Sequence, residues 1–213
     1  MSKKKSAYVV GGDPDVVNMF IENDWDVVES MRYADVVQFT GGADISPFLY
    51  SQPPHSATGS LNPWRDKTEA IVFNLCLQNN IKVAGICRGM QLINALLGGS
   101  MWQDVDNHMG DHTVEDSFYN FKYKSNSIHH QQIIPNRHCY VLGFAKQATR
   151  KEKMTVNGHL DKFKPSVPYD PEVAYWEKSN CFGVQWHPEY PCRSQSDLDE
   201  IYIHYLNDVL IGK

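Results

Sequence analysis

The sequence predicts a doubly wound α/β fold, in which helices flank a mostly parallel sheet, formed by a single domain over residues 1–213. The first observation is that short apolar segments alternate with segments of helical periodicity through the first half of the chain. Strands that alternate with helices favour a parallel sheet covered on both faces. The second is that the chain has 213 residues and no internal repeat or low-complexity linker, which fits one large domain.

The first half of the chain begins with an apolar strand that two glycines end, and Pro14 then begins a helix. Proline fits the first helical turn, where its missing N–H has no partner to lose. Val17, Phe20 and Ile21 follow at i, i+3 and i+4, which places them on one helical face. Residues 43–64 are rich in proline and predict a long loop, and long loops are usually functional. The predicted elements are strands at 7–12, 25–28, 35–42 and 81–86, a helix that opens at Asp13-Pro14, and helices at 66–77 and 88–97.

The second half of the chain is richer in predicted strands and ends in an amphipathic helix. This helix begins near Ser196, whose hydroxyl with Asp199 forms an S-x-x-D start signal. The apolar positions that share one helical face are Leu198, Ile201, Tyr202, Tyr205 and Val209. The strands are predicted at 118–123, 139–145, 172–177 and 181–186.

The composition argues against several classes of protein. A formal net charge of −5 and an isoelectric point near 6.0 disfavour a broad nucleic-acid surface. No apolar run approaches the roughly 18 residues that span a bilayer, and the N-terminus lacks a signal-peptide segment. Five cysteines without paired spacing disfavour a disulfide framework, so a reducing compartment is expected. We therefore expect a cytoplasmic protein with no nucleic-acid or membrane partner.

Cys87 directly follows a predicted strand and lies between two glycines, Gly85 and Gly89. The spacing G-x-C-x-G is typical of a nucleophile elbow, where glycines allow a sharp turn from strand to helix. Its sulfur would then stand at a helix N-terminus, which favours a thiolate, and the Arg88 N–H would point toward a developing oxyanion. The alternative is that Cys87 is a small buried core residue. The spacing alone does not decide between the two.

A thiol nucleophile needs a base, and the base needs a group that orients it. His187 and Glu189 directly follow the predicted strand at 181–186. Residues i and i+2 of an extended segment share a face, so the Glu189 carboxylate can hold the imidazole in one tautomer. Because the carboxyl ends of parallel strands meet at one edge of a sheet, this pair favours the nucleophile interpretation of Cys87.

Three segments resemble the class I glutamine amidotransferase family: GGADISPFLY at 41–50, GICRGMQLIN at 85–94 and GVQWHPE at 183–189. Within that family the chain is most similar to the gamma-glutamyl hydrolase branch, which includes the gamma-glutamyl-gamma-aminobutyrate hydrolases. The similarity runs from about residue 35 to residue 211 and implies the flavodoxin-like fold of the family. The motifs that match this branch are G-G-x-D-x-x-P at Gly41 to Pro47, R-D-x-x-E at Arg65, Asp66 and Glu69, and N-S-x-H-H-Q at Asn126, Ser127, His129, His130 and Gln131.

The resemblance implies a catalytic triad and an oxyanion hole. Cys87 matches the nucleophile, His187 the general acid and base, and Glu189 the group that orients it. Backbone N–H groups near Gly42 and at Arg88 match the oxyanion donors. The implied reaction is attack on a γ-glutamyl amide carbonyl, which forms a γ-glutamyl thioester and releases ammonia or an amine before water hydrolyses the thioester.

The resemblance also implies a substrate pocket and no metal or organic cofactor. His108 and His112 have a spacing that can place two metal ligands on one helical face. Gly110 between them disfavours a helix, and no H-E-x-x-H pattern is present. We therefore expect neither this pair nor His129 and His130 to bind a metal. The residues expected to bind substrate are Gln91, Ser127, His129 and His130.

Several functional interpretations stay open. A free-standing hydrolase would act on a small-molecule γ-glutamyl substrate, whereas a glutaminase subunit would deliver ammonia to a separate synthase partner. A non-catalytic binding module on this fold usually loses a triad residue, and all three are present. A related elbow-cysteine family of stress proteins and intracellular peptidases usually has histidine directly after the cysteine, where this chain has Arg88. Residues 146–171 form a longer and more polar connection than the family usually has, which bears on specificity or partners.

Overall fold

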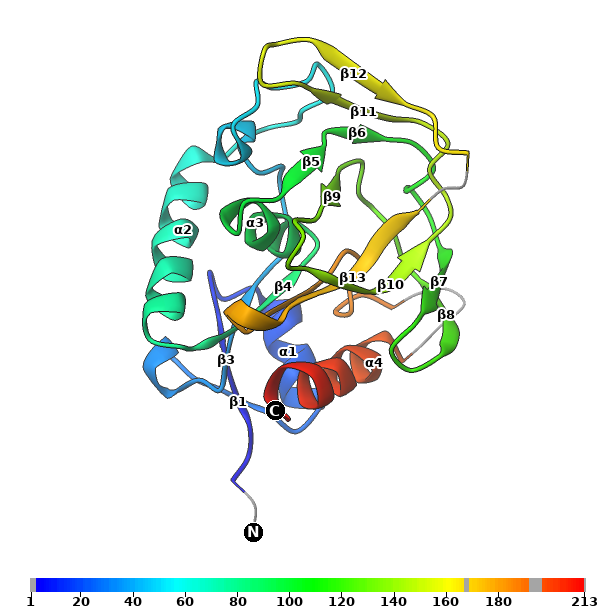
Figure 1. Ribbon diagram of the computed structural model, residues 1–213. Helices are drawn as coiled ribbons and strands as arrows, with labels where there is room; N and C mark the ends of the chain where they lie inside the picture. The colour runs from blue at the N-terminus through cyan, green and yellow to red at the C-terminus, as the bar shows by residue number, and fades with distance from the viewer. Residues whose placement is uncertain (1–2, 167–168, 192–196, 213) are drawn as a thin grey trace.

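The computed structural model describes residues 3–166, 169–191 and 197–212 of the 213-residue chain, and its central feature is a nine-stranded sheet (Figure 1). In sheet order the strands are β2 (Asp26–Val27), β1 (Ser6–Val9), β3 (Val36–Phe39), β4 (Lys82–Ile86), β14 (Cys181–Val184), β13 (Asp170–Trp176), β10 (Tyr140–Ala145), β7 (His112–Asp116) and β8 (Phe121–Ser125). The pairings from β2 to β14 are parallel, and those from β14 to β8 are antiparallel. The helices are α1 (Pro14–Glu22), α2 (Pro63–Gln78), α3 (Arg88–Leu96) and α4 (Leu198–Tyr205), which a π-helical turn at Leu206–Ile211 continues.

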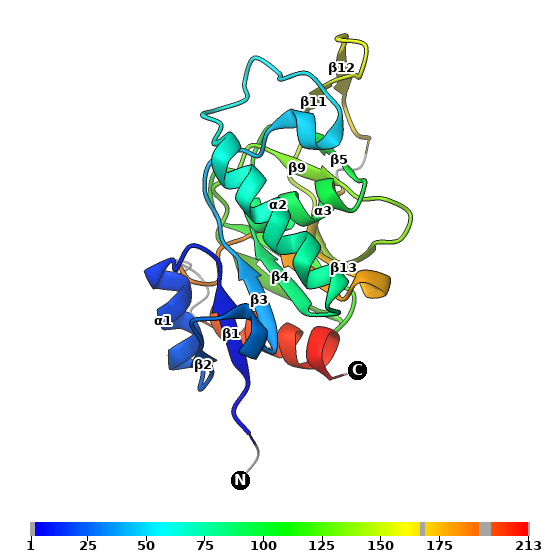
Figure 2. The ribbon, with the colours of Figure 1, turned by 90° about the vertical axis from the view of Figure 1, so that its left-hand side faces the viewer.

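Helices cover both faces of this sheet. α1 and α4 lie against one face, and α2 and α3 lie against the other (Figure 2). Alternate strand residues enter the two cores because successive side chains of a strand point to opposite faces. On β3, Val36 belongs to the core that contains Phe20 of α1, while Val37 belongs to the core that contains Phe73 of α2. The predicted doubly wound α/β class is therefore confirmed.

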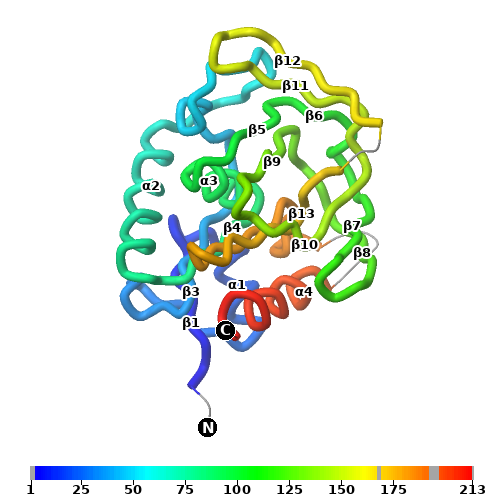
Figure 3. The backbone as a smooth tube through the Cα atoms, in the orientation of Figure 1, coloured from blue at the N-terminus to red at the C-terminus, as the bar shows by residue number. Residues whose placement is uncertain are grey.

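Two smaller sheets lie at the end of the molecule far from the N-terminus (Figure 3). The polar segment 146–171 contributes an antiparallel hairpin to one of them. The outer strand of this hairpin is exposed along its length, so no apolar alternation marks it in the sequence. The pairs are β5 (Ser100–Trp102) with β9 (Gln132–Ile134), and β6 (Asp104–Val105) with β11 (Lys151–Met154), which also pairs with β12 (Leu160–Phe163).

Two predicted elements are displaced for local reasons. The helix predicted from residue 66 begins at Pro63, because the Asn62 side chain caps its first turn. The strand predicted at 118–123 begins at Phe121. The residues before it form a turn between β7 and β8, because the Asp116 carboxylate accepts hydrogen bonds from the backbone N–H groups of Phe118 and Tyr119 at 2.7 and 2.8 Å.

The C-terminal helix begins at Leu198 with Asp197 at its N-cap, and the predicted start at Ser196 lies outside the described residues. Among the helices of the described part of the chain, none combines the length and the apolar character that a membrane crossing requires.

Candidate active site

Cys87 occupies a strained turn between β4 and α3. Its backbone has φ +49° and ψ −106°, a conformation that a residue with a side chain rarely adopts. A Cβ on Gly85 would lie 2.5 Å from the backbone carbon of Gly89, and one on Gly89 would lie 2.5 Å from the Phe39 carbonyl oxygen. Both positions therefore require glycine, because the start of α3 packs directly against the backbones of β4 and β3 and leaves no space for a side chain. The predicted elbow geometry is present.

His187 and Glu189 lie together after β14, but residues 187–190 form a turn, in which the Tyr190 N–H donates to the His187 carbonyl at 3.2 Å, and not the predicted extended segment. Imidazole Nδ1 is 2.7 Å from the Glu189 Oε1 atom, and both side chains are buried. Burial opposes a charge on His187, but hydrogen bonds with Cys87 and Glu189 outweigh it and raise the pKa of the imidazole to about 10. An imidazolium beside a thiol favours the nucleophilic thiolate. The structure thus brings the three predicted triad residues into one chain of contacts.

Asn126 fixes the backbone that carries His187. Its Nδ2 donates to the carbonyls of His187 at 2.7 Å and Tyr190 at 2.9 Å, and its Oδ1 accepts the His187 N–H at 2.8 Å. Sequence reasoning matched Asn126 to a family motif but gave it no role. The structure assigns it a positioning role, because it satisfies both backbone groups of His187.

Replacing Asn126 with alanine is expected to lower kcat about 10- to 100-fold with little change in KM, because a catalytic group displaced by about 1 Å loses that much. The rate at which a glutamine-mimicking diazo-ketone alkylates Cys87 should fall in parallel. Asn136→Ala is the matched control, since Asn136 donates to the Leu97 carbonyl away from the triad. Equal effects of the two substitutions would show that Asn126 acts only on general stability.

The loop after β3 contacts both His187 and an arginine of α2. A Cβ on Gly41 would lie 2.7 Å from His187 Cε1, and one on Gly42 would overlap the Arg65 guanidinium. Gly42 has φ +137°, which favours glycine at this position. The loop therefore reaches the triad as predicted, and the roles of the Gly42 and Arg88 N–H groups as oxyanion donors stay predictions.

The Arg88 side chain forms a buried ionic network that the sequence did not reveal. Only 1% of this side chain is exposed, and its guanidinium pairs with Asp66 at 2.6 Å and with Glu69. Glu69 also pairs with Arg65 at 2.6 Å, and Arg65 donates to the carbonyl and the hydroxyl of Thr40. The residues of the R-D-x-x-E motif thus connect the turn at Cys87 to the loop that carries Gly42, so the motif has a structural role.

Gln91 lies one helical turn after the nucleophile and is buried. Its Nε2 lies 3.3 Å from the Gln131 carbonyl and 3.4 Å from Gln185 Oε1. Gln185 in turn lies 3.6 Å from the Cys87 sulfur through its Nε2. Sequence reasoning missed Gln185, although it falls inside the GVQWHPE segment. The substrate contact predicted for Gln91 stays a prediction.

The other three predicted pocket residues have different surroundings. Ser127 donates to the His108 carbonyl at 2.7 Å, and the His129 imidazole is buried against that of His108. His130 is partly exposed and lies 3.2 Å from Asp44, and this hydrogen bond raises the pKa of His130. The Ser127 and His129 side chains thus point into the interior, so a substrate contact on this segment falls to its backbone or to His130. All three contacts stay predictions.

The Peptidase C26 family profile matches residues 4–157, which include Cys87. The chain is 31% identical over 138 residues to the YvdE homologue of Lactococcus lactis subsp. cremoris, a glutamine amidotransferase-like protein, a match that covers 55% of this chain and 73% of that one. It is 32% identical over 154 residues to the gamma-glutamyl-CDP-amidate hydrolase of Campylobacter jejuni, covering 72% and 61% of the two chains.

The fold agrees with these sequence matches. A glutamine amidotransferase from Thermotoga maritima superimposes with a TM-score of 0.60 at 16% identity, over 100% of this chain and 90% of that one. A family match over most of the chain, together with the shared fold, shows that the protein belongs to the Peptidase C26 family, which is class I glutamine amidotransferase-like.

Proposed function

We propose that the protein hydrolyses the amide bond of a small γ-glutamyl compound, either glutamine or a γ-glutamyl amine, through a thioester on Cys87. The observation that carries this proposal is the chain of contacts from Glu189 through His187 to Cys87 at the strained elbow. The similarity to a gamma-glutamyl-CDP-amidate hydrolase supports the reaction class.

In the proposed reaction the Cys87 thiolate attacks the γ-carbonyl carbon, and the carbonyl oxygen becomes an oxyanion near the Arg88 and Gly42 N–H groups. When the tetrahedral intermediate collapses, the C–N bond breaks and the His187 imidazolium gives its proton to the departing nitrogen. The neutral imidazole then takes a proton from water, which attacks the thioester. Glutamate leaves, and the thiolate and imidazolium are restored.

A groove beside the triad offers the leaving group a route to solvent. It has a volume of about 430 Å³, and Thr40, Gly41, Trp64 and Arg65 are among the residues that line it. Gly41 also contacts the catalytic imidazole, so the groove borders the group that protonates the leaving nitrogen. We place the amine portion of the substrate on this side.

A screen of glutamine and several γ-glutamyl amines with the purified protein tests the proposal. Release of glutamate and amine in equal amounts without any added protein is the expected result, and it would favour a free-standing hydrolase over a glutaminase subunit that needs a synthase partner. A glutamine-mimicking diazo-ketone should alkylate Cys87, since burial raises the pKa of the Cys76 and Cys139 thiols to about 12. Absence of both turnover and a Cys87 adduct would overturn the proposed function.

Glu189→Gln should move the alkaline limb of the kcat/KM profile to lower pH. The raised pKa of His187 keeps the imidazole protonated, and able to act as an acid, through neutral pH. Removing the carboxylate charge lowers that pKa, so the acid form is lost at a lower pH, by about one unit or more. A pH–rate profile measures this shift. Glu177→Gln, on the 3₁₀ turn after β13, is the control and should leave the profile in place.

A further inference from the structure

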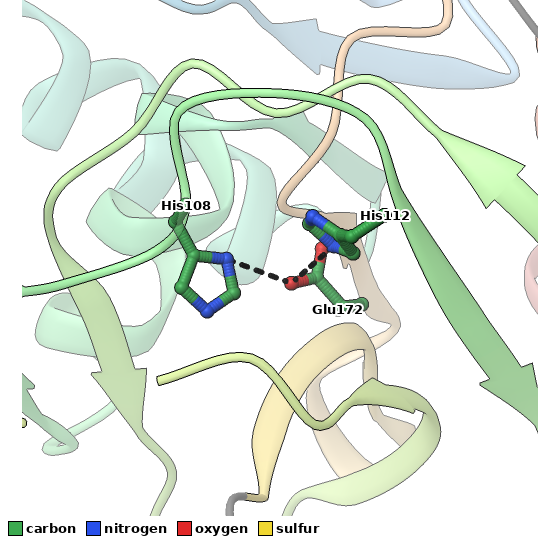
Figure 4. A group of neighbouring side chains, drawn as sticks. All are labelled: His108, His112 and Glu172. Atoms are coloured by element: carbon green, nitrogen blue, oxygen red, sulfur yellow. Dashed lines mark ion pairs between the residues drawn. The ribbon is translucent and has the colours of Figure 1, made fainter. Parts of the chain in front are cut away.

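Three imidazoles surround one buried carboxylate next to the triad. Glu172 on β13 has its Oε1 atom 3.2 Å from His112 Nε2, 3.6 Å from His108 Nδ1 and 3.9 Å from His129 Nε2. Figure 4 shows the His108 and His112 rings turned toward this carboxylate from the chain that leads into β7. All four side chains are at least 97% buried.

The sequence disfavours a metal at His108 and His112 because Gly110 lies between them and no H-E-x-x-H pattern is present. No helix joins them, because Gly110 adopts φ +145° in a bend before β7. That bend nevertheless turns both imidazoles toward Glu172, and His129 reaches the same carboxylate from a separate segment. The spacing H-x-x-x-H predicts that two histidines share a metal only when they lie on a helix. It therefore does not predict a cluster that a bend and two separate segments bring together.

The polar atoms at the centre of the cluster lack hydrogen bonds. Within the described residues, neither carboxylate oxygen of Glu172 accepts a hydrogen bond of ordinary geometry, and the three nitrogens that face the carboxylate make none either. Burying a carboxylate is costly unless a cation or well-placed donors compensate it. Buried lone pairs that converge without hydrogen bonds are the arrangement of metal ligands.

The second nitrogens of two of the imidazoles, His129 and His108, lie near an oxygen atom. An N–H directed at such an oxygen fixes the tautomer and leaves the lone pair of the other nitrogen directed at Glu172. This is how metal-binding histidines are usually held. The oxygens are the Gln131 carbonyl, 2.9 Å from His129 Nδ1, and Asp170 Oδ2, which lies 3.2 Å from His108 Nε2 without hydrogen-bond geometry; His112 Nδ1 has no hydrogen bond within the described residues.

We propose that His108, His112 and Glu172, joined by His129, bind one divalent transition-metal ion, and that the ligand set selects zinc. Zinc binds imidazole nitrogen and carboxylate oxygen at about 2.0–2.2 Å with tetrahedral geometry, which separates neighbouring ligand atoms by roughly 3.3 Å. The separations from Glu172 Oε1 are 3.2, 3.6 and 3.9 Å, and the ligand atoms of His108, His112 and Glu172 all lie within 4.8 Å of one another, so the imidazoles would move closer together around an ion, and His129 lies farthest from the carboxylate. Calcium and magnesium prefer all-oxygen sites, so this set disfavours them.

The metal would have a structural role, because four protein ligands in a buried site leave no position for substrate. The cluster ties the bend at 108–112 to the segment that carries Ser127 and Asn126, and Asn126 holds the catalytic His187. The backbone carbonyl of Glu172 also accepts the N–H of Gln185, whose side chain contacts Cys87. The ion would therefore hold in place the segments that position His187 and Gln185.

Metal binding by the full chain, freed of any purification tag, tests this proposal. After treatment with a chelator, titration with Co²⁺ should show about one ion per chain and the visible absorption of a four-coordinate site. Zn²⁺ should displace it and raise the melting temperature by about 5–10 °C. His112→Ala and Glu172→Gln should each weaken binding about tenfold or more. His204→Ala, an exposed histidine of α4, should bind as the wild type does.

A second control separates loss of the site from loss of the fold. His55 is a buried histidine 3.4 Å from Glu152, outside the cluster, so His55→Ala should perturb packing and retain about one ion per chain. The proposal is overturned if the wild type binds no Co²⁺ or Zn²⁺, or if His112→Ala binds as tightly as the wild type. Because metal content is measured without substrate, these outcomes are independent of the proposed hydrolase activity.

Discussion

Cys87→Ala is expected to lower the rate of glutamate release from a γ-glutamyl amide by about 10⁴-fold or more while the fold is retained. Without the sulfur no thioester forms, and water must attack the amide with only the oxyanion donors and His187 to assist it. Steady-state glutamate release measures the loss, and intact-mass analysis of the reacting enzyme should show the thioester in the wild type alone. Cys139→Ala should be nearly silent, and equal losses in the two variants would contradict the role of Cys87.

The strained backbone of Cys87 provides a second measurement on the same residue. A side chain at φ +49° and ψ −106° stores about 1–3 kcal/mol, which glycine relieves and alanine does not. Cys87→Gly should therefore be more stable than Cys87→Ala, the reverse of the usual order at an ordinary position. Urea unfolding of the two inactive variants measures this difference. A more stable Cys87→Ala would mean that the elbow carries no strain.

The parallel half of the fold could be predicted because its signals are local. Apolar runs mark β1, β3 and β4, Pro14 marks the start of a helix, and glycines mark the turns that follow the strands. The strands β5, β6, β7, β9, β11 and β12 were not predicted. They are short, or they expose alternate or all residues to solvent, so no apolar pattern distinguishes them from loops.

Some residues of the candidate site could likewise be predicted from local sequence patterns, and others could not. The positions of Cys87 and of the His187–Glu189 pair could be predicted because each stands directly after a buried strand, although a turn and not an extended segment brings Glu189 to His187. Gln185 and Asn126 were missed as site residues, since their roles depend on contacts with residues 98 and 61 positions away. The Glu172 cluster was missed for the same reason.

Arg88→Met should give the largest loss of stability, about 3–5 kcal/mol in the free energy of unfolding. Methionine fills similar space but leaves the carboxylates of Asp66 and Glu69 buried without the cation between them. Urea unfolding with an unchanged m value would report this loss as a lower midpoint. Arg150→Met is the matched control, because Arg150 pairs with Asp104 at 2.8 Å but is partly exposed, and such pairs contribute about 1 kcal/mol or less.

The substitution Arg65→Met tests whether the ion-pair network around Arg88 supports activity as well as stability. Its side chain is 28% exposed, and it contacts both Glu69 and the loop of Thr40 and Gly42. Because solvent can replace a partly exposed partner, Arg65→Met should cost little stability, yet it frees the loop that carries the proposed oxyanion donor. We therefore expect a lower kcat with nearly unchanged unfolding for Arg65→Met, and a lower unfolding midpoint for Arg88→Met. If Arg65→Met retains full activity, the network supports the fold alone, and the Gly42 loop is held by other contacts.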